Sequence, residues 1–370
     1  MAGVVDADTH IIEHDGIWKL LEPEVYARRP VLMGIPNDTL YKENNGLWLI
    51  DGAIFPKPAG KGSFAIANPA SDREKARTDI DVAVRHISDP QARVRDMDKR
   101  GVDVEVVFPT LFLAYLTDDA ELEAALCRAY NKWMAQAWKE SGNRLRWVVV
   151  PPLHSIDVTL QEVEAGKENG AVGVFFRGVE GDRSLADPYF FPIYAKAEEL
   201  GMAVCVHTGA GAPAITNVFD RAFSHNLPHV RSLPLFAFRD IVAHRLPERF
   251  PGLNFGFIEA SASWVPFVLH HIQRSLRGVN IGSSNPAASV ALGPELFRDY
   301  RLFIACETDE DLPYLLTYIG EDNMIVGSDY GHEDQSRETD VVAMMRSRED
   351  IPTSTIEKIL ADNPRRFYGL

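Results

Sequence analysis

The sequence predicts an α/β fold, namely a (β/α)8 barrel of the TIM type with a lid-like insertion after the first strand–helix unit. Three observations support this prediction. Eight short apolar runs recur along the 370 residues, with helix-like segments between them, and such alternation produces a parallel sheet. Several helical segments end in glycine, as left-handed C-caps require. Polar or charged residues follow most of the apolar runs, where the active sites of such barrels lie.

The eight apolar runs are short and rich in Val, Ile and Phe, which is typical of strands buried on both faces. They lie at residues 4–5, 102–107, 146–150, 171–176, 203–206, 255–258, 302–305 and 324–327. The main helical patterns lie at residues 119–140, 156–168, 188–200, 264–276 and 310–319. Asp118 and Asp119 both suit the N-cap of the first of these helices. The expected C-cap glycines are Gly142, Gly170, Gly201 and Gly320.

The chain is longer than the roughly 250 residues of a simple barrel, so part of it must lie in insertions. We predict one domain over residues 1–370, with a main insertion at about 30–85 that is rich in Gly, Pro, Asn and Asp. Its 40–55 portion is expected to form a small hairpin, with turns at Asn45-Gly46 and Asp51-Gly52. Smaller insertions lie at 209–229 and 278–292. The insertions either cover the barrel mouth or form surface excursions or subunit contacts.

Composition restricts the class of protein and its partners. A hydrophobic content of 46% and a charged content of 25% fit a soluble globular protein with a large core. The net charge of -15 argues against nucleic acid and anionic membranes as partners. Three scattered cysteines do not make a disulfide framework, and neither a signal peptide nor a membrane span is evident. We therefore expect a cytoplasmic protein whose partner is a small molecule. We also expect a homo-oligomer (a dimer or a tetramer).

The first apolar run leads into three alternating polar residues, Asp6, Asp8 and His10. Residues two apart in a strand point to the same side, so all three are expected to face one way. Two carboxylates and an imidazole aimed inward suggest a divalent cation, with Zn, Fe or Mn as the ions that suit these ligands. The alternative is an exposed edge strand with a polar face.

Five later strands also end in a charged or ionisable residue. These residues are Arg177, His207, Glu259, Glu307 and Asp329. A single residue of this kind is ordinary, but unpaired charges buried together are very costly. A bound metal ion would remove that cost, so the pattern favours a metal centre at the carboxyl ends of the strands.

Three motifs resemble those of the amidohydrolase superfamily. They are Asp6-Ala7-Asp8-Thr9-His10, Val206-His207-Thr208-Gly209 and Gly327-Ser328-Asp329-Tyr330-Gly331-His332, and residues 362–369 are similar to the family's C-terminal segment. The resemblance is specifically to the amidohydrolase-2 group, which includes aminocarboxymuconate semialdehyde decarboxylase and γ-resorcylate decarboxylase. It spans nearly the whole chain except the 30–85 insertion.

The resemblance implies one divalent ion, or two, held by Asp8, His10, His207 and Asp329. Asp329 is also implied to contact the activated water or the substrate proton, and His332 of the same motif is a further catalytic candidate. One departure concerns the sixth strand, where the decarboxylases carry histidine and this chain carries Glu259. We expect Glu259 to act as a base or as a metal ligand, or else to orient His207 or Arg177.

Two reactions are compatible with this site. The first is hydrolysis, in which metal-activated water attacks an ester, thioester or amide-type bond of a small apolar or aromatic substrate and Asp329 or Glu259 takes the proton. The alternative is decarboxylation of a small aromatic or unsaturated carboxylic acid. Arg177 would then clamp a substrate carboxylate, unless it pairs with Glu259. A closed, non-catalytic metal site is disfavoured because structural zinc sites prefer cysteine.

Overall fold

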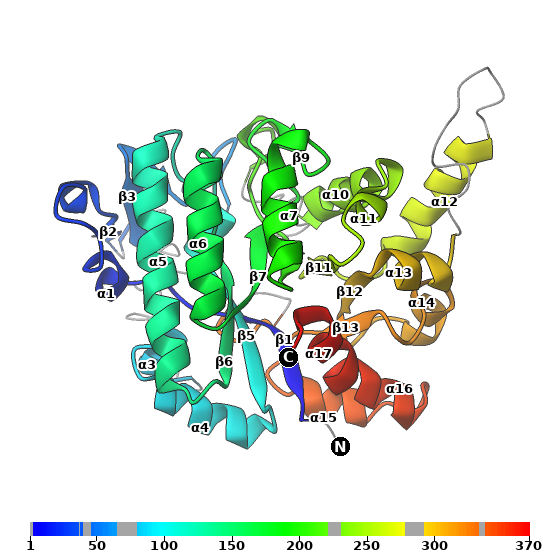
Figure 1. Cartoon of the computed structure of the whole chain (residues 1–370). Coiled ribbons are helices and arrows are strands. Elements are labelled where there is room, and N and C mark those ends of the chain that lie inside the picture. The colour runs from blue at the N-terminus through cyan, green and yellow to red at the C-terminus, as the bar shows by residue number, and fades with distance from the viewer. Residues whose placement is uncertain are drawn as a thin grey trace.

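Eight parallel strands form a nearly closed barrel in the computed structural model, which describes residues 3–36, 38–39, 46–64, 80–220, 231–277, 292–332 and 337–370 (Figure 1). In spatial order the strands are β1 (Val5–His10), β5 (Val104–Phe108), β6 (Leu145–Val149), β7 (Ala171–Phe176), β10 (Ala203–His207), β11 (Phe255–Ile258), β12 (Leu302–Cys306) and β13 (Met324–Val326). The predicted barrel is therefore confirmed, and every predicted strand overlaps an observed one.

The barrel closes where the segment after β13 meets β1. The amide of Asp329 donates to the carbonyl of Asp8 over 3.1 Å, and the amide of His10 donates to the carbonyl of Tyr330 over 2.7 Å. Gly327 makes this approach possible, since a Cβ there would lie 2.3 Å from the Cβ of Asp8. The first and last motifs of the chain consequently lie side by side.

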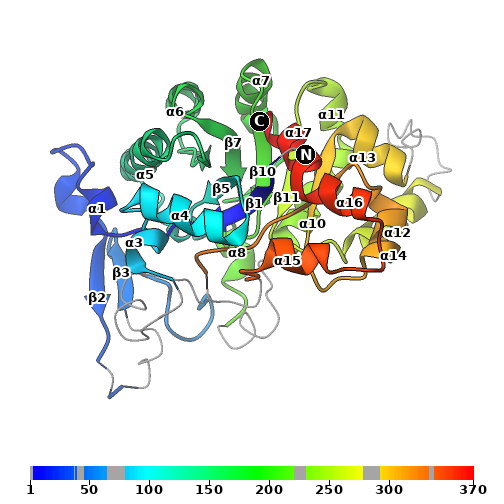
Figure 2. The ribbon, with the colours of Figure 1, turned by 90° about the horizontal axis from the view of Figure 1, so that it is seen from below.

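Helices cover the outside of the barrel, and α5, α6 and α7 stand next to one another in both views (Figures 1 and 2). The longer helices are α4 (Pro90–Arg100), α5 (Ala120–Glu140), α6 (Ile156–Glu168), α7 (Phe191–Glu199), α10 (Ser232–Ala243), α12 (Val265–Arg277), α13 (Pro294–Tyr300) and α14 (Leu312–Ile319). Asp119 caps α5 by accepting from two backbone amides. Gly142, Gly170, Gly201 and Gly320 all have positive φ, as predicted for glycines at helix ends. Gly320, with ψ 161°, is nevertheless not left-handed helical.

Shorter helices complete the layer. They are α1 (Asp15–Trp18), α3 (Val82–Arg85), α8 (Pro213–Thr216), α11 (Leu246–Arg249), α15 (Val341–Arg346), α16 (Thr353–Glu357) and α17 (Asn363–Tyr368), with 3-10 turns η1 (Tyr26–Arg28), η3 (Leu111–Leu113) and η4 (Pro188–Phe190), a π turn η7 (Lys358–Asp362) and a small ribbon of β8 (Val179–Glu180) and β9 (Arg183–Ser184). The two ends of the chain meet, because Arg365 donates to the carbonyl of Gly3. Among the described segments, no helix is both long and apolar enough to cross a bilayer.

Every residue of β7, β10, β11 and β12 is buried. One face of each strand packs inside the barrel and the other against the helices, so neither face is exposed to solvent. This double burial explains why the strands read in the sequence as continuous apolar runs rather than as alternating patterns.

The described part of the 30–85 insertion contains an antiparallel sheet of β2 (Val31–Gly34), β3 (Gly46–Ile50) and β4 (Ala53–Phe55). The β3–β4 hairpin turns at Asp51-Gly52, where both residues have positive φ, as its sequence predicted. Asn45 of the other predicted turn lies outside the described residues, as do most of the 278–292 insertion and residues 221–229 of the 209–229 insertion.

The insertion lies against the carboxyl-terminal face of the barrel, on the side where β3 and α8 lie in Figure 2. The amide of Gly62 donates to the carbonyl of Phe219 over 2.6 Å. A cavity of about 270 Å³ lies between residues 53–64 and the segments that follow β5 and β10. This is the position expected of a lid-like insertion.

The prediction that Asp6 shares a face with Asp8 and His10 is wrong. Asp6 lies opposite Glu105 of β5, whereas Thr9 lies opposite Val107, so β1 has one extra residue between these pairs. Such a β-bulge shifts the alternation of side chains by one position. Asp6 consequently points out of the barrel toward α4, while Asp8 and His10 point inward.

Candidate metal centre

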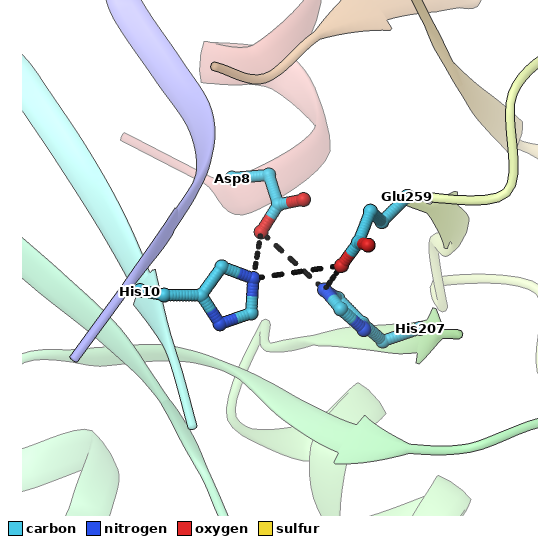
Figure 3. Close-up of side chains that lie close together, drawn as sticks. All are labelled: Asp8, His10, His207 and Glu259. Carbon is cyan, nitrogen blue, oxygen red and sulfur yellow. Dashed lines mark ion pairs between the residues drawn. The ribbon is translucent and has the colours of Figure 1, made fainter. Parts of the chain in front are cut away.

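Four side chains from the carboxyl ends of β1, β10 and β11 converge inside the barrel, namely Asp8, His10, His207 and Glu259 (Figure 3). His10 Nε2 lies 3.4 Å from Asp8 Oδ1 and 3.6 Å from Glu259 Oε2. His207 Nε2 lies 3.5 Å from the same Asp8 oxygen and 3.2 Å from the same Glu259 oxygen. Two imidazole nitrogens and two carboxylate oxygens therefore face one common point.

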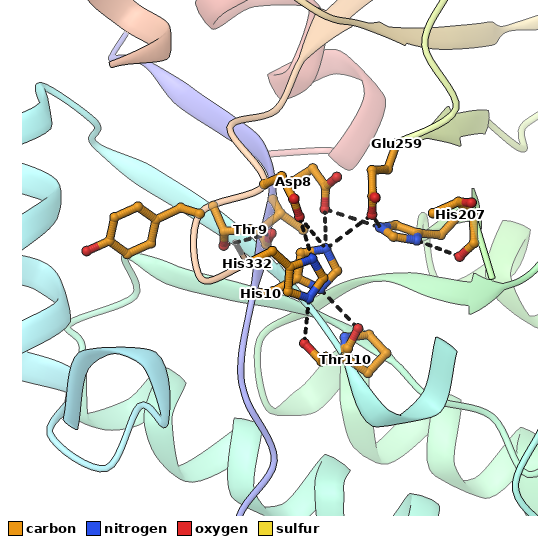
Figure 4. Close-up of polar contacts among 12 residues, drawn as sticks. Asp8, Thr9, His10, Thr110, His207, Glu259 and His332 are labelled. Carbon is orange, nitrogen blue, oxygen red and sulfur yellow. Dashed lines mark hydrogen bonds and ion pairs between the residues drawn. The ribbon is translucent and has the colours of Figure 1, made fainter. Parts of the chain in front are cut away.

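The end of β13 adds two more groups to the cluster (Figure 4). Asp329 Oδ1 lies 3.2 Å from His10 Nε2 and 2.7 Å from His332 Nδ1. The ring of His332 stacks on that of His10, with centroids 3.7 Å apart. All six residues predicted as ligands or catalytic groups on β1, β10, β11 and β13 thus lie together; Arg177 alone does not.

Backbone carbonyls orient both histidines of the first group. Nδ1 of His10 lies 3.0 Å from the carbonyl oxygen of Pro109, and Nδ1 of His207 lies 2.8 Å from that of Thr208. A carbonyl oxygen can only accept a hydrogen bond, so each Nδ1 carries the proton. Each Nε2 of a neutral ring then directs its lone pair into the cluster, as metal-binding histidines do.

Burial and neighbouring charges shift the pKa values of these rings in opposite directions. Burial lowers the pKa of His10 well below its usual value, and the nearby rings of His332 and His207 lower it further. Burial also acts to lower the pKa of His207, but the carboxylates of Asp8 and Glu259 outweigh it and raise that pKa. Burial therefore favours the neutral form of His10, which is the form that binds a metal ion.

Three atoms of the cluster test whether a metal fits. Within the described part of the chain, Asp8 Oδ1, His10 Nε2 and His207 Nε2 have no hydrogen-bond partner, and the three side chains are almost completely buried. Buried polar groups without partners cost about 1–3 kcal/mol each, and more if charged. A divalent cation would supply the missing partner, and this nitrogen and oxygen donor set suits Zn, Mn or Fe. The residues present therefore fit such an ion.

Backbone strain marks both carboxylates that follow β11 and β13. Glu259 has φ 49° and Asp329 has φ 50°, a region that residues other than glycine rarely adopt. Such a conformation costs about 1–3 kcal/mol and persists only where the surroundings enforce it. The strain aims both carboxylates into the cluster, and the sequence gives no sign of it.

Arg177 lies outside the cluster, and its predicted pairing with Glu259 is wrong. Its Nη2 lies 2.5 Å from Glu180 Oε2, and its Nη1 donates to the carbonyl of Ala114 over 2.6 Å. Glu180 follows Arg177 by only three residues, across Gly178, which has positive φ. This turn places the carboxylate of Glu180 against the guanidinium of Arg177, so Arg177 pairs locally and not with Glu259 across the barrel. The substrate clamp stays a prediction.

Two residues near the cluster were missed in the sequence. Thr110 Oγ1 lies 2.8 Å from His332 Nε2, and the carboxylate of Glu13 accepts from the amides of Thr110 and Leu111 over 3.0 and 2.8 Å. Burial raises the pKa of Glu13 to about 7. Thr110 follows Phe108 by two residues at the end of β5, so the rule that polar residues gather at strand ends would have found it.

Comparisons with known proteins agree with this geometry. The amidohydrolase family model (Amidohydro_2) matches residues 5–370. A curated relative, the 2-amino-3-carboxymuconate-6-semialdehyde decarboxylase of Dictyostelium discoideum, is 24% identical over 292 residues, which cover 76% of this chain and 77% of the relative.

Two solved structures share the fold over all of this chain. An amidohydrolase of Mycobacterium avium subsp. paratuberculosis is 21% identical, with a TM-score of 0.76 and 98% of that chain covered. The 5-carboxyvanillate decarboxylase of Novosphingobium aromaticivorans, solved with manganese and a nitrobenzoic acid, is 14% identical, with a TM-score of 0.69 and 96% covered. Because the family match spans nearly the whole sequence, the protein belongs to the amidohydrolase family and is an enzyme, either hydrolase-related or a carboxy-lyase.

Proposed function

We propose that the protein is a divalent-metal-dependent decarboxylase of a small aromatic or unsaturated carboxylic acid. The observation that carries the proposal is the buried cluster of imidazole and carboxylate groups, with three atoms that lack partners among the described residues. The curated relative and the 5-carboxyvanillate neighbour are both named as decarboxylases. These comparisons support the sequence's alternative reading better than hydrolysis.

Asp8, His10 and His207 would hold the ion, with Glu259 and Asp329 completing its surroundings. A cation bound there would neutralise the clustered carboxylates and draw electron density from a coordinated substrate oxygen. The carbonyls of Pro109 and Thr208 keep both imidazoles turned toward this position. The protein's own groups thereby fix where the substrate's polar end must lie.

Asp329 and His332 would move the proton that decarboxylation requires, and their contacts support this role. Thr110 Oγ1 donates to the carbonyl of Ile11 over 2.6 Å, so it must accept from His332 Nε2, which carries a proton. The other ring nitrogen faces Asp329 Oδ1 at 2.7 Å, and a bond at that distance needs a second proton. In the reaction the bond between the substrate carbon and its carboxylate breaks, CO2 leaves, and the electron pair on that carbon takes the proton.

Hydrolysis is the second candidate, and Glu259 is the observation that favours it. A carboxylate lies near both His10 and His207, where the resembling decarboxylases carry histidine. A carboxylate in that position suits a general base for water.

One experiment separates the two reactions. Purified protein is supplied with Mn, Zn or Fe and incubated with carboxyl-labelled hydroxybenzoates and unsaturated acids, and in parallel with esters, thioesters and amides. The proposal predicts labelled CO2 from an acid, no turnover of the other compounds, and loss of CO2 release in Asp329→Asn. Hydrolysis of an ester, thioester or amide without CO2 release from any acid would overturn it.

A further inference from the structure

A buried ionic network lies outside the barrel wall, behind the seam where β1 meets the segment after β13. The carboxylate of Glu105 pairs with Arg93 over 2.7 Å and with Arg100, both from α4. Arg100 also reaches Asp6 Oδ2 over 3.5 Å. Asp6 belongs to this network because the bulge in β1 turns it outward. We call Asp6, Arg93, Arg100, Glu105 and Tyr330 the seam network.

Tyr330 lies at the centre of the seam network, directly after Asp329. Its buried ring is flanked by two guanidinium groups, with the Cζ of Arg93 4.3 Å and that of Arg100 3.6 Å from the ring centroid. Its hydroxyl donates to Asp96. Its carbonyl accepts from the amide of His10 over 2.7 Å. The residue after Asp329 is therefore fixed through its ring and its backbone.

Ser328, the residue before Asp329, is fixed by the same network. Its amide donates to Asp6 Oδ1 over 2.9 Å, and its hydroxyl donates to Asp6 Oδ2 over 2.5 Å. The Ser328 hydroxyl also accepts from the amide of Tyr330 over 3.2 Å. The Asp6 carboxylate thus holds Ser328, and the Ser328 hydroxyl holds the amide of Tyr330. The residues on both sides of the strained Asp329 are therefore connected.

The chemistry of the network points to geometry rather than to stability. Burying ion pairs is an inefficient way to stabilise a fold, because desolvation offsets most of the attraction and apolar residues of equal volume do as well. Directed hydrogen bonds instead fix positions closely. Asp329 needs such fixing, because its positive φ is maintained only where the surroundings over-determine the backbone.

We propose that the seam network sets the orientation of the Asp329 carboxylate, with Asp6, Ser328 and Tyr330 acting as positioning residues from outside the barrel. Without these anchors the backbone of Asp329 relaxes toward negative φ, and its carboxylate turns away from His10 and His332. This positioning role rests on the proposed function, in which Asp329 helps to move the proton.

Ser328→Ala tests the proposal, because it removes the hydroxyl that joins Asp6 to the amide of Tyr330. We expect kcat to fall by about 10–100-fold, the scale on which outer groups act on a metal site. KM for the substrate should stay near wild type. The unfolding midpoint should fall modestly, because Asp6 and the amide of Tyr330 each lose a buried partner, but the protein should remain folded at the assay temperature. Ser328→Thr keeps the hydroxyl and should recover most of kcat. Ser347→Ala is the matched control, with kcat near wild type, because it removes an exposed hydroxyl that donates only to the carbonyl of Met344 over 2.8 Å.

A crystal structure of Ser328→Ala gives a readout that needs no substrate. The proposal predicts that the Asp329 carboxylate leaves its position near His10 Nε2, where the distance is now 3.2 Å. If the carboxylate stays in place and kcat is unchanged, the seam network does not position it. If kcat of Ser328→Ala falls only as far as its lowered unfolding midpoint explains, and Ser328→Thr recovers neither, the network has a structural role alone. If the wild type releases no CO2 from any acid, but the Asp329 carboxylate is displaced in Ser328→Ala, the positioning role is supported and only the proposed reaction is rejected.

Discussion

Glu259 brings a third carboxylate to a site that already contains Asp8 and Asp329. Its oxygen lies 3.2 Å from His207 Nε2 and 3.6 Å from His10 Nε2. Negative charge near a cation strengthens its binding, and the effect is large because the surroundings are buried. We therefore expect Glu259 to contribute to holding the ion rather than to donate the proton.

Glu259→Gln separates the two roles because it keeps the size of the side chain and removes its charge. If Glu259 holds the ion, affinity for Mn or Zn should fall by about 10–100-fold, measured by competition with a chelator. If it is instead the base of a hydrolase, kcat for hydrolysis should fall by about 10²–10⁴-fold while the metal content stays full. Glu307→Gln, a carboxylate that ends β12 and pairs with Arg231, is the matched control. Unchanged affinity and unchanged turnover would exclude both roles.

Arg177 is engaged by Glu180 and by the carbonyl of Ala114. Arg177→Gln would leave the buried carboxylate of Glu180 without its charge partner, and breaking a buried pair in this way costs about 3–5 kcal/mol. We expect that loss in the free energy of unfolding, measured with urea. The double change with Glu180→Gln should recover much of it. Full stability with a raised KM for acidic substrates would contradict this view and restore the substrate clamp.

The strands and helices of the barrel could be predicted because the sequence of each segment favours the structure that the barrel needs at that position. Strands buried on both faces must be apolar, and helices between them end at glycines with positive φ such as Gly142 and Gly170. The bulge in β1 could not be predicted, because no residue in Asp6–His10 marks an extra position. That one bulge decides which carboxylate faces the cluster, so Asp6 was misplaced while Asp8 was not.

Gly327 also shapes the seam next to the bulge, because it allows the end of β13 to approach β1 closely. A Cβ at this position would lie 2.3 Å from the Cβ of Asp8 and 2.9 Å from its amide nitrogen. Gly327→Ala should therefore destabilise the fold by about 1–3 kcal/mol through overpacking and lower the metal content, because Asp8 must shift. Thermal unfolding and metal analysis measure both effects.

Gly34→Ala in β2 is the control for that variant, since nothing lies within 4 Å of a Cβ built there. Gly34→Ala should leave the metal content unchanged. It should lower the stability by no more than an ordinary surface substitution does. If Gly327→Ala behaves as Gly34→Ala does, the seam has more room than the structure indicates.

At the scale of the whole molecule, the candidate ligands come from residues 8 to 332 and meet only because the barrel closes. The position of polar residues after apolar runs was enough to find Asp8, His10, His207, Glu259 and Asp329 in the sequence. Which of them touch one another depends on the shear of the barrel and on the turn after each strand. The pairing of Arg177 with Glu180 shows this limit, because it arises from a local turn that strand patterns do not describe.

Metal binding at this cluster would consequently be linked to folding of the entire chain, since the ligand set does not exist in the unfolded state. A ligand that binds only the folded state raises its stability. Removal of metal by a chelator should lower the thermal unfolding midpoint, and adding the ion back should restore it.

The ratio of metal to protein, measured by plasma mass spectrometry on protein purified without chelators, tests the central claim most directly. Wild type and His154→Ala should carry a full complement of a divalent transition metal, because His154 lies near the surface and pairs with Glu123 away from the cluster. His207→Ala, which removes a buried ligand at the centre of the cluster, should retain little metal and release no CO2. A full complement of metal in His207→Ala, or none in the wild type after exposure to Mn, Zn and Fe, would contradict the assignment of this site.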